Sequence, residues 1–181
     1  KVGDTTTGIS MTSIVASIDW ATDNGARVVN MSFEAAAACT QASFPALRDA
    51  IGRARDNGVN LVAAAGNSAV NVDNVTPASC PGVISVAAID QGNNLAQYSS
   101  RGANVGISAP GGGGFFIFNP NGTVNATSPV YGNTVGTPAC NPDPGSAFNA
   151  NTLGVVSAWT TSPTSGNSHC YRCLSGTSMA A

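Results

Sequence analysis

The stretch Leu61-Val62-Ala63-Ala64-Ala65-Gly66-Asn67-Ser68 decides the fold of this chain. Its unbroken apolar run predicts a buried parallel strand over 59–65, because a strand covered on both faces shows no polar alternation. The run stops at Gly-Asn, which places the Asn67 amide at the carboxyl edge of a sheet, where open α/β folds bind ligands. The small side chains of Ala63, Ala64 and Ala65 suit either one wall of a cleft or tight packing of a helix on the strand.

The segments around this strand alternate between helical and extended patterns. Apolar spacing predicts helices over 11–24 and 41–57, each ended by a glycine. We expect Trp20 to pack against the body. Runs rich in β-branched and small apolar residues predict strands over 27–33, 83–88, 105–109 and 155–159. Lys1-Val2 is expected to be a further strand that forms a parallel βαβ unit with 27–33. This alternation predicts an α/β fold with a mostly parallel sheet.

A second informative stretch is Ser175-Gly176-Thr177-Ser178-Met179-Ala180-Ala181, near the end of the chain. A turn of small residues runs into the first turn of a helix, where free backbone N–H groups favour negative charge. A serine at this point can attack a carbonyl carbon while its own N–H helps to hold the oxyanion. Asn67 would supply a second oxyanion donor to Ser178. The structural alternative is a Ser/Thr-rich helix cap.

The composition excludes several classes of function. The chain has 181 residues, of which 9% are charged, and a formal net charge of −2, so no basic patch points to nucleic acid. No apolar run reaches the roughly 18 residues of a membrane span. We expect one domain, a monomer and no nucleic-acid or membrane partner.

Five cysteines favour an oxidising compartment. We expect Cys140 to pair with Cys170 or Cys173, which leaves the other of these two cysteines without a partner. His169, Cys170 and Cys173 have an alternative interpretation as a metal or redox module. Zinc would need a fourth ligand, and none is evident at the right spacing.

Taken together, these stretches resemble the subtilisin-like serine proteases (subtilases, peptidase family S8), in which the serine motif reads Gly-Thr-Ser-Met-Ala and the oxyanion asparagine follows Ala-Ala-Gly. Such a set is far more specific than a single motif. The same resemblance extends through Val28-Val29-Asn30-Met31-Ser32, Thr76-Pro77-Ala78-Ser79-Cys80-Pro81-Gly82-Val83-Ile84-Ser85-Val86-Ala87-Ala88, Tyr98-Ser99-Ser100-Arg101-Gly102 and Ala109-Pro110-Gly111.

The resemblance implies a three-layer α/β fold and a secreted endopeptidase that acts on proteins and peptides. It makes Ser178 the nucleophile and Asn67 the oxyanion residue, and it implies a Cys39–Cys80 disulfide and a cis Thr76–Pro77 bond. The chemistry would need no cofactor, and structural calcium would belong to the full-length protein. Residues expected to bind substrate are Ser32, Phe33, Glu34, Ala63, Ala64, Ala65, Gly66 and Thr177.

The chain also departs from the family pattern. Phe33-Glu34-Ala35 stands where the family usually has glycines, so Glu34 would either favour a basic side chain in the specificity pocket or be a solvated loop glutamate. The family's aspartate and histidine motifs are absent, and His169 lies in a predicted surface loop with the wrong order and motif for the base.

We therefore expect 1–181 to be part of a catalytic domain, without the Asp/His-bearing N-terminal part and the C-terminal helices, and with 111–151 as a loop insertion. The piece alone should be inactive. The alternative is a subtilase-like module that binds peptides without cleaving them.

Overall fold

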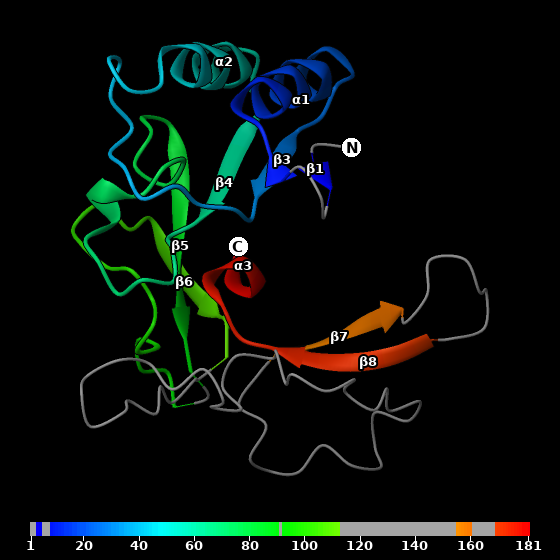
Figure 1. Ribbon diagram of the computed structural model, residues 1–181, viewed down its shortest axis with the longest axis vertical. Helices are drawn as coiled ribbons and strands as arrows, with labels where there is room; N and C mark the ends of the chain where they lie inside the picture. The colour runs from blue at the N-terminus through cyan, green and yellow to red at the C-terminus, as the bar shows by residue number, and fades with distance from the viewer. Residues whose placement is uncertain (1–2, 5–7, 91, 113–154, 161–168) are drawn as a thin grey trace.

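The computed structural model describes residues 3–4, 8–90, 92–112, 155–160 and 169–181, and of 155–160 and 169–174 it describes the backbone path (Figure 1). A parallel sheet of four strands organises this part of the chain, in the order β3 (Val28–Met31), β4 (Asn60–Ala64), β5 (Val83–Ile89), β6 (Ile107–Pro110). The register pairs Met31 with Ala63 and Ala63 with Ser85, so the carboxyl ends of β3, β4 and β5 lie at one edge.

Two helices cover one face of this sheet, α1 (Met11–Asp23) and α2 (Pro45–Asp56). The Ser10 hydroxyl caps α1 by accepting the Ser13 N–H, and α2 begins at Pro45 because proline suits the first helical position. The apolar stripes of both helices share one core with side chains of β3, β4 and β5. Buried core residues are Ile14, Ile18, Met31, Leu47, Ala50, Ile51, Ala54, Leu61, Ala63, Ala65 and Ala87.

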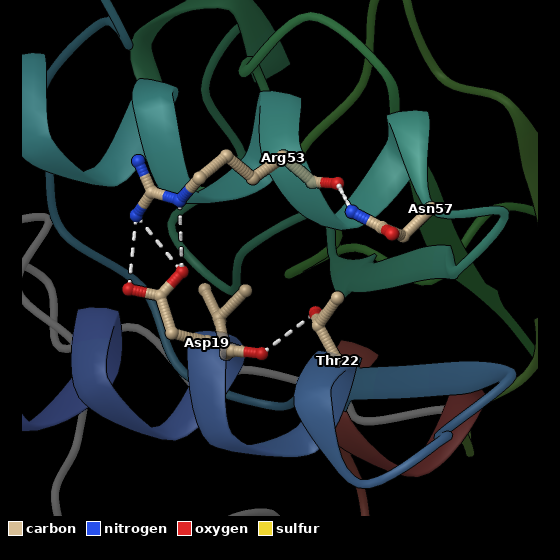
Figure 2. A network of polar contacts seen from close by, with 5 residues as sticks. Asp19, Thr22, Arg53 and Asn57 are labelled. Carbon is tan, nitrogen blue, oxygen red and sulfur yellow. Dashed lines mark hydrogen bonds and ion pairs between the residues drawn. The ribbon is translucent and has the colours of Figure 1, made fainter.

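An ion pair joins the two helices at the surface (Figure 2). The Arg53 guanidinium donates to both carboxylate oxygens of Asp19, at 2.8 and 2.9 Å. Thr22 and Asn57 donate to carbonyl groups of their own helices. The pair is largely exposed, so its contribution to stability is on the order of 0.2–1 kcal/mol. It is therefore a minor link between the two helices, whose main contact is their shared core.

The opposite face of the sheet is covered only in part by the described residues. Val28, Ile84 and Ile107 are 60%, 42% and 57% exposed on this side. The short helix α3 (Thr177–Ala180) packs against β4, β5 and β6. Ala180 packs against a cluster that contains Ala88, whereas the preceding Ala87 belongs to the core under α1 and α2. Since successive residues of a strand face opposite sides, α3 lies on the other face from α1 and α2, and the predicted three-layer α/β arrangement is confirmed.

The remaining elements are two small antiparallel pairs and a short 3-10 helix (Figure 1). β1 (Gly3–Asp4) pairs with β2 (Gly8–Ile9), and β7 (Val155–Thr160) pairs with β8 (His169–Leu174). The 3-10 helix η1 spans Val72–Asn74.

The strand predicted at Lys1-Val2 and its parallel pairing with 27–33 lie outside the described residues, and the first described strand, β1, pairs antiparallel with β2. Two details of the sequence prediction are wrong. His169 begins strand β8 and is not in a loop. Trp20 is 68% exposed on α1 and does not pack against the described body. The insertion predicted over 111–151 lies outside the described residues from 113 onward, and so do Cys140 and the side chains of Cys170 and Cys173. No helix in the described ranges is both long and apolar enough for a membrane span.

Candidate active site

The site is built where the carboxyl ends of β3 and β4 meet the start of α3. Ser32 follows β3, Gly66 and Asn67 follow β4, and Thr177 and Ser178 open α3. Ser178 Oγ donates to the Ser32 carbonyl at 3.3 Å, and Ser32 Oγ donates to the Ser178 carbonyl at 3.2 Å. Segments separated by more than a hundred residues therefore meet at one edge of the sheet, as the positions of the strand ends predict.

The orientation of the Asn67 amide is set by Thr177. Asn67 Oδ1 accepts the Thr177 backbone N–H at 2.8 Å and the Thr177 hydroxyl at 3.0 Å. Two donors on one oxygen assign the other end of the amide as Nδ2. Within the described part of the chain, neither Nδ2 of Asn67 nor the backbone N–H of Ser178 has an acceptor. Among the described residues both donors therefore lack an acceptor at the start of α3, as an oxyanion site requires.

Thr177 is the buried link between the serine and the strand. Its side chain is fully buried, and its Oγ1 accepts the Gly66 backbone N–H at 3.1 Å while donating to Asn67. A buried N–H without a partner would be costly. This one hydroxyl therefore both accepts the N–H of Gly66, which follows β4, and helps to orient the Asn67 amide.

Tyr98 supports the serine turn from the other side. Its hydroxyl lies 2.8 Å from the Gly111 carbonyl and 2.6 Å from the Gly112 carbonyl, and the Gly111 carbonyl also accepts the Gly176 N–H at 2.9 Å. Burial raises the pKa of Tyr98 to about 12, since the charged phenolate would lose its hydration. The tyrosine therefore remains a neutral donor at any physiological pH and fixes the backbone that precedes Thr177.

Glu34 contacts Asn67 from the opposite side to Thr177. Its Oε2 accepts the Asn67 backbone N–H at 2.9 Å, although the side chain as a whole is exposed. A Cβ on Gly66 would collide with this same oxygen, and Gly66 has φ +104°, a conformation that favours glycine. Glu34 is thus an exposed carboxylate with a defined partner, which differs from a freely solvated loop glutamate.

The segment after Glu34 is tied to the loop before β5. Ala35 and Thr76 exchange backbone hydrogen bonds at 2.8 and 3.0 Å, and Thr76 Oγ1 donates to the Ala37 carbonyl at 2.7 Å. The Thr76–Pro77 bond is cis, as expected. A disulfide joins Cys39 to Cys80, as the resemblance implied. These ties hold the backbone that carries Glu34 against the core.

The other residues expected to bind substrate take several positions. Ser32 is exposed at the edge, whereas Phe33 packs against the core under α1 and α2. Ala63 and Ala65 are buried in that same core, and Ala64 is buried on the other side of β4. Their small side chains pack the sheet closely on both faces.

Sequence reasoning missed three residues that border this site. They are Tyr98, Ser100 and Val75, to which the sequence patterns give no role at the site. Val75 and Ser100 are buried beside Gly66, with Val75 Cγ1 and Ser100 Oγ each 3.1 Å from where a Gly66 Cβ would lie. Local patterns could not have found them, because their place depends on the loop that returns to the end of β4.

No metal site accompanies these groups in the described ranges, where no three His, Cys, Asp or Glu side chains gather.

Comparison with known proteins agrees with this geometry. Subtilisin DY of Bacillus licheniformis is 41% identical over 102 residues, covering 55% of this chain and 35% of its own length. An extracellular protease of Xanthomonas campestris pv. campestris is 34% identical over 145 residues, covering 75% of this chain and 24% of its own. The chain thus spans about a quarter to a third of the length of these relatives.

Solved structures match as well. A Pseudoalteromonas arctica protease superposes with a TM-score of 0.69 at 28% identity, covering 96% of this chain and 44% of the other. A lanthipeptide protease has the same fold, with a TM-score of 0.70 at 21% identity over 100% of this chain and 50% of its own. The model of the subtilase family, peptidase family S8, matches residues 1–181. The chain belongs to the subtilase family of peptidases.

Proposed function

We propose that this chain is the nucleophile-bearing part of a serine endopeptidase that cleaves peptide bonds through an acyl-enzyme on Ser178. One observation carries the proposal: Thr177, the residue before Ser178, holds Asn67 Oδ1, and Asn67 Nδ2 has no acceptor among the described residues. An amide with one end bound and the other end free is pre-organised to donate to a charge that forms only during the reaction.

The chemistry follows from these groups. Ser178 Oγ attacks the substrate carbonyl carbon and gives its proton to a base, and the carbonyl electron pair moves onto oxygen. Asn67 Nδ2 and the Ser178 N–H donate to this oxyanion. The C–N bond then breaks, and the amine leaves with the proton that the base returns. Water attacks the acyl-enzyme in the same way and releases the acid, so the cycle consumes only water and needs no cofactor.

The base and its orienting carboxylate are assigned to the full-length protein. In the described structure Ser178 Oγ donates to the Ser32 carbonyl, which is no base. A hydroxyl without a base is a weak nucleophile, so we propose that the piece alone is inactive. We also propose that the full-length protein is secreted, because a matching relative is named an extracellular protease and Cys39–Cys80 is oxidised.

Kinetics of the full-length protein test this function. Ser178→Ala should reduce hydrolysis of a peptide substrate by about 10⁶-fold, which is the loss that removal of the nucleophile causes in subtilisin, a member of this same family. Ser108→Ala, on the exposed strand β6, is the matched control and should hydrolyse the substrate normally. Peptide binding without turnover in the wild type would instead show a binding module and refute the proposal.

A further inference from the structure

Glu34 brings a negative charge into contact with the residue that would hold the oxyanion. Its Oε2 accepts the Asn67 backbone N–H at 2.9 Å. The ion pairs of the described residues are Arg53 with Asp19 and Arg55 with Asp56, so no described cation neutralises Glu34. The carboxylate is exposed and keeps its other oxygen, Oε1, without a partner in the described part of the chain.

The surroundings of this carboxylate offer a second polar group. Ser100 is fully buried, and its Oγ has no hydrogen-bond partner among the described residues. That Oγ lies 3.1 Å from where a Cβ of Gly66 would be, the same point at which such a Cβ would collide with Glu34 Oε2. Buried hydroxyls are nearly always paired, so this one is an unused acceptor beneath the Glu34 carboxylate and offers it no proton-donating partner among the described residues. The apolar Val75 Cγ1 lies 3.1 Å from the same Gly66 Cβ position.

The position of the Glu34 carboxylate next to Asn67 identifies which part of a bound substrate it would contact. When the substrate carbonyl meets Ser178 Oγ and its oxygen meets Asn67 Nδ2, the side chain of that same residue starts one carbon away. It therefore lies beside Asn67, within reach of the carboxylate on the Asn67 N–H. A cationic side chain with several N–H donors matches an exposed carboxylate, which accepts hydrogen bonds and carries the opposite charge.

Electrostatics gives the cation a role in the reaction as well as in binding. The oxyanion forms next to Asn67, whose backbone N–H already bonds a carboxylate, and like charges so close repel each other. A neutral substrate side chain leaves this repulsion in place during the reaction. A lysine or arginine side chain offsets it, so the benefit extends to kcat and is not confined to KM.

We propose that Glu34 is a specificity-determining residue that selects lysine or arginine at the substrate residue whose carbonyl Ser178 attacks. This inference rests on the proposed function. Glu34 accepts a hydrogen bond from the cation through Oε1 and keeps Asn67 through Oε2.

The test uses the full-length protein and peptides that differ only at this residue, with lysine, arginine, norleucine or alanine. Norleucine has the length of the lysine stem without its charge. The wild type should cleave the lysine peptide about 10- to 100-fold faster in kcat/KM than the norleucine peptide, the size of a charge-assisted hydrogen bond. High salt should reduce this ratio.

Glu34→Gln separates charge from hydrogen bonding, because its amide oxygen can still accept the Asn67 N–H. This variant should bring the lysine-to-norleucine ratio close to one and still cleave the norleucine peptide. Asp23→Asn is the matched control, since it removes one exposed carboxylate from α1 with the same change in net charge. Its ratio should equal that of the wild type.

A wild-type ratio near one, or an equal ratio in wild type and Glu34→Gln, overturns the inference. So does a preference for alanine over both long side chains, which would mean that Glu34 fills the space. These results leave the proposed function intact as long as peptides are cleaved through Ser178. If no peptide is cleaved and Ser178 does not react, the proposed function itself fails. The wild-type ratio is decisive even where a variant does not fold.

Discussion

Asn67 is held from two sides, and the two sides differ in chemistry. On one side, Thr177 is fully buried and neutral, and it bonds the Asn67 side chain. On the other side, Glu34 is exposed and charged, and it bonds the Asn67 backbone. Buried neutral contacts fix geometry, whereas an exposed charge can still interact with what arrives from solvent. The Thr177 side therefore accounts for how the amide is oriented, and the Glu34 side for which substrate it serves.

Asn67→Leu removes the residue on which both sides converge, and it should have the largest effect. We expect kcat to fall by about 10²- to 10³-fold with little change in KM, which is the range that loss of the oxyanion asparagine causes in subtilisin, a member of this same family. Asn67→Asp is the matched variant, because it keeps the oxygen that Thr177 bonds but lacks the free donor, and kcat should fall at least as far. Normal kcat in both variants would contradict the oxyanion role.

Gly66→Ala should disrupt the contact between Glu34 and the Asn67 backbone. The new Cβ would collide with Glu34 Oε2, and φ of +104° disfavours any side chain. We expect a loss of about 2 kcal/mol or more in unfolding free energy, measured by denaturant titration in a Ser178→Ala background that prevents self-digestion. In a Glu34→Ala background the same change should cost less, by about 1 kcal/mol. An equal loss of unfolding free energy in both backgrounds would show that the Glu34 carboxylate does not lie against Gly66.

Thr177→Val should disrupt the contact between Thr177 and the Asn67 side chain. The variant keeps the shape of the side chain but removes the acceptor of the Gly66 N–H and a donor to Asn67. We expect a loss of about 1–3 kcal/mol in unfolding free energy, because a buried N–H loses its partner, and a lower kcat because the amide is held by one donor only. Thr12→Val, on the exposed surface of α1, should change stability by less than about 0.5 kcal/mol. Normal kcat in Thr177→Val would show that the Thr177 hydroxyl is not needed to orient Asn67 for the reaction.

Tyr98→Phe tests an indirect support of the Thr177 side, because the Tyr98 hydroxyl contacts the Gly111 carbonyl, which also accepts the Gly176 N–H. At neutral pH we expect a loss of about 1 kcal/mol in unfolding free energy. The pKa of Tyr98, raised by burial to about 12, lies above the value near 10 of an unfolded tyrosine. The unfolded chain therefore loses its proton first, and the stabilisation present below pH 10 is lost as pH rises toward 12.

The stability gap between wild type and Tyr98→Phe should consequently narrow over that pH range. Denaturant titrations at pH 8, 10 and 11 would measure it, and a gap that widens would contradict the buried, neutral tyrosine.

The same comparison shows what sequence reasoning can reach. The apolar run before Gly66 predicts β4 and the edge at which Asn67 lies, because parallel strands place their carboxyl ends together. The contact between Asn67 and Thr177 follows from that edge once the serine turn is placed on it. α2 begins at Pro45, four residues later than its apolar spacing suggests, because a proline fixes the first helical position.

The Glu34 side could not be read from sequence in the same way. Whether its carboxylate reaches the Asn67 N–H depends on φ at Gly66 and on the ties between Ala35 and Thr76. The orphaned Ser100 hydroxyl depends on how the loop before β6 returns to β4. Neither is a property of a local pattern. Trp20 shows the converse, since helical spacing alone cannot tell whether a neighbour covers the outer side of α1.

The most direct test of the oxyanion geometry is where a fluorophosphonate probe reacts in the full-length protein. Ser178 and Ser32 form a hydrogen bond to each other's carbonyl groups, so both hydroxyls lie in the site, but only Ser178 lies on the turn whose preceding residue bonds Asn67. Mass spectrometry of the labelled peptides should find the adduct on Ser178, formed far more slowly in Asn67→Leu. An adduct on Ser32, or none at all in a correctly folded protein, would contradict the account.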